Sequence, residues 1–212
     1  MAQDDWFHKT TWSDSDEQDF FARLKRSRSS YHKAQYLRIQ AHALAQTNKE
    51  SLVLASLELL RRIFEEFPEP SQLTAAHLQA ARCYELLGKT ELALYHFRLS
   101  LLAKSKYPNS DSGTALEYAW FIVVHNLTEH FGAAINALQS ARLDFPVQIF
   151  QASAVRAFIA HENGDRDAQR FAIEALEAAA LNKSQFRNHS ALGLVGEKYR
   201  SQVERLRVIA AA

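Results

Sequence analysis

Nine histidines are the side chains of this 212-residue chain that best suit metal binding or acid–base chemistry. His125 and His130 lie close together around an expected turn, with Glu129 between them, and His161 lies near another turn beside Glu162. Neither group has the H-E-x-x-H spacing, or another spacing that places two ligands on one side of a metal ion. The histidine pattern therefore predicts no metal site.

The sequence also contains no motif for a catalytic nucleophile or a phosphate-binding loop. The single cysteine, Cys83, excludes a disulfide framework and a Cys-x-x-Cys metal site, and we predict an inert, buried thiol because no activating neighbour is evident. Glu65 and Glu66 are adjacent on an expected helix, so their carboxylates diverge and do not share a proton. Gly-rich phosphate loops and G-x-S-x-G motifs are absent from the sequence. We therefore predict a non-enzymatic protein with no catalytic residues and no cofactor.

Composition and charge narrow the class of partner. The formal net charge is +1, whereas a dedicated nucleic-acid binder normally carries a clear excess of basic residues. The longest uncharged apolar run, residues 118–124, is far shorter than the roughly 20 residues that a membrane helix needs. The acidic N-terminal residues do not resemble a signal peptide. We expect a cytoplasmic protein that binds neither nucleic acid nor membrane.

The elements that position the side chains are expected to be helices, because alanine and leucine dominate the sequence and both favour helix. Ser13 and Asp16 predict the start of a first helix, and Thr47 with Glu50 predicts a capping box at a later one. Further helices are expected over residues 31–46, 52–67, 114–127, 133–145, 147–162 and 166–181, with a last one from about residue 197. Residues 71–108 are expected to form two antiparallel helices that are joined by a turn at Gly88.

Prolines and glycines divide this helical pattern into pairs. The four prolines, Pro68, Pro70, Pro108 and Pro146, all fall between expected pairs of helices. Gly88, Gly132 and Gly164 fall at or near the turns inside pairs. Because proline cannot continue a helix and glycine ends one readily, this alternation indicates repeated αα-hairpins.

The hairpin at residues 71–108 resembles the tetratricopeptide repeat family, whose pattern is W-x2-L-G-x2-Y, then A-x3-F, then alanine and a closing proline. Tyr84 matches the tyrosine, Ala93 and Phe97 match A-x3-F, and Gly88 lies at the usual turn. The departures are His77 at the tryptophan position, Ala81 at the glycine position and Ser100 at the later alanine.

The neighbouring hairpins resemble this family less closely. Their anchor alanines, Ala55, Ala93, Ala134 and Ala168, are spaced 38, 41 and 34 residues apart, and only the last interval is the family's standard one. His125 is assigned the tyrosine position of its repeat, so we expect a buried histidine there. The chain also looks like small bacterial proteins of this repeat class, from which no activity can be carried over.

The resemblance implies an all-α fold, a right-handed α-solenoid of about four tetratricopeptide-like hairpins. An extra N-terminal helix precedes them and a C-terminal helix caps them. We expect a single domain over residues 1–212, with an N-terminal part at 1–34, the repeats at 35–181 and a C-terminal loop and helix at 182–212. The first helix of each hairpin is expected to line a concave groove.

The predicted groove presents a mixture of aromatic, apolar and hydrogen-bonding side chains. It comprises Gln40, Leu44, Leu78, Gln79, Arg82, Glu85, Trp120, Val123 and Asn126. An equally good explanation of the apolar helix around Trp120 is that it packs against a terminal helix. The segment with Trp6, Phe7 and Trp12 either covers the groove or contacts a second subunit.

Our leading hypothesis is a non-enzymatic scaffold that binds a protein or peptide in this groove. The alternative is a bacterial immunity or regulatory protein that sequesters a cognate toxin or enzyme. A metal-dependent or other enzyme that uses the histidines ranks third. The sequence leaves a homodimer open.

Overall fold

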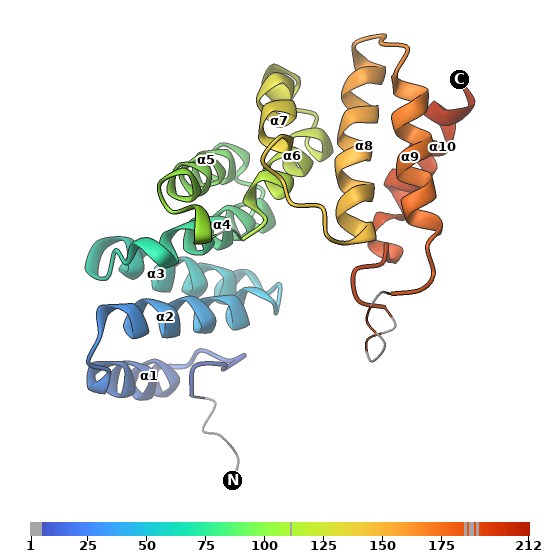
Figure 1. Cartoon of the computed structure of the whole chain (residues 1–212). Helices are drawn as coiled ribbons and strands as arrows, with labels where there is room; N and C mark the ends of the chain where they lie inside the picture. The colour runs from blue at the N-terminus through green and yellow to red at the C-terminus, as the bar shows by residue number, and fades with distance from the viewer. Residues whose placement is uncertain (1–5, 111, 185, 187–188, 190) are drawn as a thin grey trace. The chain divides into compact units, whose positions relative to one another are not determined.

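Every regular element in the part of the chain that the computed structural model describes is a helix (Figure 1). The described residues are 6–110, 112–184, 186, 189 and 191–212. The predicted all-α class is confirmed. None of the described helices combines the length and the apolar composition that crossing a membrane would require.

The chain divides into two compact units, one up to Thr114 and one from Ala115 onwards, and each is described by itself. The expectation of a single domain with boundaries at residues 34 and 181 stays a prediction.

The first unit consists of a leading helix and two helical hairpins. Its helices are α1 (Asp14–Arg26), α2 (Ser30–Ala45), α3 (Glu50–Glu66), α4 (Pro70–Leu86) and α5 (Thr90–Lys106). Helix α2 packs against α3 and helix α4 packs against α5, so each pair forms a hairpin. The hairpins are stacked, because α4 also contacts both α3 and α2.

The predicted N-terminal capping box is present in α1 and absent in α3. Ser13 and Asp16 form the predicted capping box, in which the Asp16 N–H donates to Ser13 Oγ at 3.2 Å. The capping box predicted for Thr47 and Glu50 is wrong. Lys49 is the N-cap of α3, and the Thr47 hydroxyl donates instead to the Leu44 carbonyl at 2.7 Å.

The N-terminal segment packs on α1 and α2. The Trp6 ring lies 5.2 Å from the Phe20 ring and 4.9 Å from the Tyr36 ring, measured between centroids. The Lys9 N–H donates to Gln40 Oε1 at 3.0 Å, and Gln40 Nε2 donates back to the Lys9 carbonyl at 2.7 Å. The aromatic segment therefore packs against the core of the first unit and binds Gln40, one of the predicted groove residues. Its expected contact with a second subunit stays a prediction.

The second unit contains a hairpin and a covering C-terminal helix. Its helices are α6 (Thr114–Val124, which starts at the last residue of the first unit), α7 (Phe131–Leu138), α8 (Pro146–Glu162), α9 (Ala168–Ala180) and α10 (Arg200–Ala211). Helices α8 and α9 pair, and α10 packs against both through the buried Leu206 and Ile209. The predicted position of the C-terminal helix against the last hairpin is confirmed. Helix α7 ends seven residues before the predicted Phe145.

Four turns that follow α2, α4, α6 and α8 share one backbone feature. Each contains a residue with a positive φ angle, between 52° and 67°: Asn48, Gly88, Asn126 and Gly164. These residues are 40, 38 and 38 positions apart. Glycine, and to a lesser extent asparagine, tolerates this left-handed conformation, which explains their use here. The turn after α6 therefore lies at Asn126, and the predicted turn residue Gly132 lies inside α7.

A buried alanine occurs seven positions before each of these turn residues. The four are Ala41, Ala81, Ala119 and Ala157, each with 0 % of its surface exposed. Small side chains let helix backbones approach closely. This explains why the position seven residues before the turn is an alanine in each of the four helices. The left-handed turn residue and this alanine together define a structural repeat that the sequence spacing alone did not reveal.

We predict that Ala81→Leu lowers the free energy of unfolding by about 2 kcal/mol, because a larger side chain overfills a closed contact. The matched control is Ala75→Leu on the same helix, where the side chain is half-buried; it is expected to change stability by about 0.5 kcal/mol or less. Urea unfolding followed by circular dichroism measures both. Equal effects of the two substitutions would show that position 81 is not a tight contact.

Candidate functional site

Helices α2 and α4, the first helices of the two stacked hairpins, carry a group of polar and basic side chains. We call Arg38, His42, Gln72, Gln79 and Arg82 the α2–α4 cluster. The two helices contact each other directly, so side chains on their shared side can interact.

Two glutamines of α4 orient the guanidinium of Arg38. Arg38 Nε donates to Gln72 Oε1 at 2.9 Å. In the amide orientation that satisfies both of its groups, Gln79 donates to the Arg38 carbonyl at 3.1 Å and accepts from Arg38 Nη1 at 3.3 Å. The arginine head is therefore held in place by neutral groups.

The charge of Arg38 is not balanced inside the described part of the chain. Burial lowers the pKa of Arg38, which means that its cation is partly removed from water. No carboxylate among the described residues forms an ion pair with it, and its hydrogen-bonding partners are amides. A half-buried, oriented guanidinium of this kind is a ready binding group for a carboxylate.

The pKa of His42 is influenced by the positive charges of the same surface. Its imidazole is reachable by solvent, yet partial desolvation lowers the pKa of His42, and the charges of Arg82 and Arg38 lower it further. Like charges disfavour protonation, so three basic groups from two helices influence one another here. An anion bound in the cluster would offset the effect of the two arginines on His42.

Three predicted groove residues lie in or beside this cluster. Gln79, Arg82 and Glu85 are half-buried on α4, and the first two belong to the α2–α4 cluster. The prediction that they contact a partner is compatible with their partial exposure, and it stays a prediction.

Four other predicted groove residues are buried, so their side chains are not accessible to a partner in this structure. They are Gln40, Leu44, Leu78 and Val123, with at most 3 % of the surface of each exposed. Gln40 binds the backbone of Lys9. The three apolar side chains are part of the protein core, because they lie on the packed sides of α2, α4 and α6.

The last two predicted groove residues lie in the second unit. The Trp120 ring lies 5.4 Å from the Tyr199 ring and 6.0 Å from the Phe150 ring. This contact supports our alternative explanation, in which helix α6 packs against the C-terminal part of the chain. Asn126 is exposed, but it is the left-handed turn residue and its backbone role explains its identity.

Sequence reasoning missed Arg38, His42 and Gln72. Aligning the turn residues Asn48 and Gly88 places Arg38 in register with Leu78 and His42 in register with Arg82. Our groove assignment for α2 used Gln40 and Leu44 instead, and each lies two positions after the residue that this register indicates. The turn asparagine was the signal that would have corrected it.

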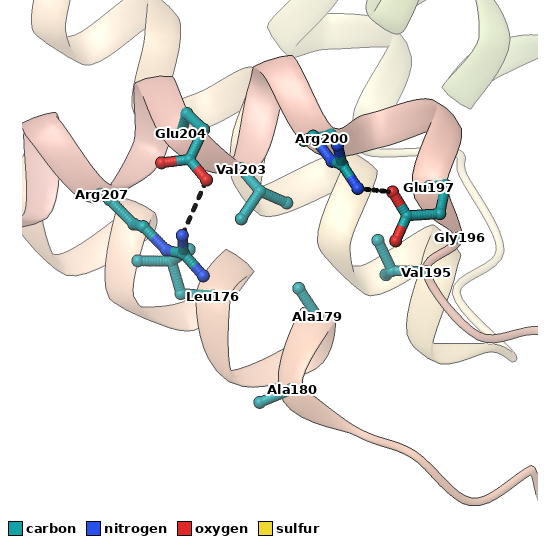
Figure 2. A pocket seen from close by; sticks show the side chains of 10 residues that line it. All are labelled: Leu176, Ala179, Ala180, Val195, Gly196, Glu197, Arg200, Val203, Glu204 and Arg207. Atoms are coloured by element: carbon teal, nitrogen blue, oxygen red, sulfur yellow. Dashed lines mark hydrogen bonds and ion pairs between the residues drawn. The ribbon is translucent and has the colours of Figure 1, made fainter.

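A second surface is a pocket of about 420 Å³ in the second unit, between α9, α10 and residues 195–197 (Figure 2). Leu176, Ala179 and Val203 contribute apolar side chains to its walls. Its four charged residues form two internal ion pairs, Arg200 with Glu197 at 2.5 Å and Arg207 with Glu204 at 2.7 Å. The charges of this pocket are thus balanced by its own residues, unlike that of Arg38.

A pair of neighbouring histidines lies between α4 and α5. His77 Nδ1 and His96 Nδ1 are 3.1 Å apart, and the His77 ring stacks on Phe64 with a centroid distance of 4.2 Å. Burial, and then the proximity of His96, lowers the pKa of His77 to about 4. Burial also lowers the pKa of His96. The neutral forms of both rings are therefore favoured, and the N–H of one ring donates a hydrogen bond to the ring nitrogen of the other.

The other side chains considered for chemistry have structural surroundings. His125 is exposed and lies against the Phe121 ring, so the expectation of a buried histidine is wrong; the turn at Asn126 assigns the tyrosine position to Ile122 instead. Cys83 is buried 3.4 Å from Ser56 Oγ, and burial raises the pKa of its thiol. Within the described residues, no three histidine, cysteine or acidic side chains are grouped as metal ligands.

Comparison of the chain with protein-family models, curated proteins and solved structures found no match. The geometry of the chain itself is therefore the basis for choosing among its surfaces. The α2–α4 cluster stands out because it has an oriented charge that its surroundings do not neutralise.

We predict that His77 makes the protein less stable as the pH falls from 6.5 to about 4. In this window the unfolded chain binds more protons than the folded chain, because the folded pKa is about 4 and the ordinary value is 6.5. The free energy of unfolding of the wild type should therefore fall by about 2 kcal/mol more than that of His77→Gln. Urea unfolding at a series of pH values measures the difference.

The matched control for this experiment is His161→Gln, which removes an exposed histidine on α8. Its stability should follow that of the wild type across the whole pH range. Parallel curves for the wild type and His77→Gln would contradict the assigned role of the buried histidine.

Proposed function

We propose that this protein is a non-enzymatic scaffold that binds an acidic segment of a protein or peptide partner through the α2–α4 cluster. The single observation that carries the proposal is the half-buried guanidinium of Arg38, which two glutamines orient and no described carboxylate neutralises. A carboxylate of the partner, from an aspartate, a glutamate or the chain end, would complete its hydrogen bonding.

The repeated hairpins support the same proposal. In a right-handed tetratricopeptide-like solenoid, the first helices of successive hairpins line one concave surface. The four equivalent turn residues and the four equivalent buried alanines are compatible with such a repeat. On this basis α2 and α4 are the first helices of two successive repeats, and the α2–α4 cluster belongs to the groove.

The charges of the cluster favour an acidic partner over an apolar one. After desolvation, the charges of Arg82 and Arg38 lower the pKa of His42 further, which supports a positive potential at this surface. A bound carboxylate gains from both arginines and offsets the charges that disfavour protonation of His42. Binding is therefore expected to weaken as the salt concentration rises.

The test is affinity capture from the native cell with the wild type and with the double variant Arg38→Gln/Arg82→Gln. Losing charge-assisted hydrogen bonds should reduce the amount of the captured partner by about ten-fold or more. The matched control is Arg26→Gln, which removes an exposed arginine at the end of α1. Mass spectrometry identifies and quantifies the captured proteins.

Circular dichroism confirms that each variant is folded before capture. Undiminished capture by the folded double variant would refute the proposal. A loss of equal size in Arg26→Gln would also refute it, because the effect would then reflect net charge and not the cluster.

A further inference from the structure

The first unit contains a pocket that shares no residue with the α2–α4 cluster. It has a volume of about 340 Å³, and its walls come from α3, α4, Lys89 and α5. Small-molecule sites in proteins are typically about 300–1,000 Å³, mostly apolar, and contain a few polar groups at defined positions. The size and the lining of this pocket, which we call the α3–α5 pocket, fall within that range.

Aromatic rings form much of the pocket wall. Phe64, Tyr84 and His96 all line it. The His96 ring centroid is 5.2 Å from that of Tyr84 and 5.8 Å from that of Phe64. The imidazole of His77, which does not line the pocket, stacks on the Phe64 ring. Rings at these distances are suited to contact a planar apolar group through stacked or edge-on geometry.

Lys89 is the one charged residue lining the pocket that forms no ion pair in the described part of the chain. Arg61 is held by Glu58 at 2.6 Å and also by Glu65. Lys89 lines the pocket and is exposed, and no acidic side chain among the described residues forms an ion pair with it. The pocket therefore offers one free ammonium group beside an aromatic wall, which is the complement of an aromatic anion.

We propose that the α3–α5 pocket binds a small planar aromatic carboxylate. The ring system lies against Phe64, Tyr84 and His96, and the carboxylate pairs with Lys89. The lowered pKa of His96 keeps its imidazole neutral at neutral pH, so this ring acts as part of the wall and not as a second cation. This binding activity is separate from capture of an acidic partner at the α2–α4 cluster.

The experiment is an NMR titration of the full chain with three probes of the same shape: 1-naphthoate, neutral 1-naphthamide and cationic 1-naphthylmethylammonium. We expect 1-naphthoate to shift the ring resonances of His96 and His77 and to bind about three-fold more tightly than the amide. The cationic probe should bind most weakly.

Lys89→Gln tests the assigned charge, and Lys49→Gln is its matched control. Both lysines are exposed and both are the N-cap of the second helix of a hairpin, but only Lys89 lines the pocket. Lys89→Gln should abolish the preference for the carboxylate over the amide, whereas Lys49→Gln should keep it. Leu54→Trp, at a half-exposed position of the wall, should weaken binding of both probes.

The proposal is overturned if no probe shifts the histidine resonances at millimolar concentration, or if all three bind equally. It is also overturned if the carboxylate preference survives in Lys89→Gln. The Lys89 and Lys49 substitutions are on the surface, so these two variants decide the question even if Leu54→Trp does not fold.

Discussion

The buried alanine that recurs on α2, α4, α6 and α8 is the constraint on which the rest of this structure depends. In each of the four helices that precede a left-handed turn, this alanine lies seven positions before the turn residue. The turn residue sets where the chain reverses, and the methyl group sets how near the next helix can come. When both are fixed, the side chains that lie on the remaining side of α2 and α4 are also fixed. This geometry positions Arg38 and Arg82. Arg38 lies three residues before Ala41 of α2, and Arg82 directly follows Ala81 of α4.

The functional proposal follows from what this geometry leaves unsatisfied. Helices α2 and α4 bring together basic groups, and the described surroundings of Arg38 supply amides and no carboxylate. Several exposed arginines are paired within their own helices, as Arg61 is with Glu58 and Arg207 with Glu204. Such exposed pairs contribute little to stability and leave no net charge to attract a partner. The half-buried guanidinium of Arg38, which amides orient, is therefore the physical reason for proposing a binding surface on α2 and α4.

Much of the helical architecture could be predicted from sequence, because proline and glycine end helices through local backbone chemistry. Pro70 and Pro146 begin α4 and α8, where the missing N–H of proline is tolerated.

The residues of the groove were harder to predict than the helices. Alanine is frequent in these helices, so alanine spacing did not fix the register of α2, and the left-handed φ angle of Asn48 is not evident from residue type. Gln40 was assigned to the groove by counting repeat positions, whereas its side chain here binds the backbone of a segment 31 positions away. Pairings over such a distance depend on tertiary structure.

The central claim is that a carboxylate of the partner binds between Arg38 and Arg82. The most direct measurement is an NMR pH titration of the His42 ring in the free protein and in the complex with the captured partner. At present the nearby arginine charges lower the pKa of His42, after the larger effect of desolvation. A carboxylate in the cluster would offset those charges, so the account predicts that the pKa of His42 rises on binding. A His42 pKa that stays the same or falls in the complex would contradict the account.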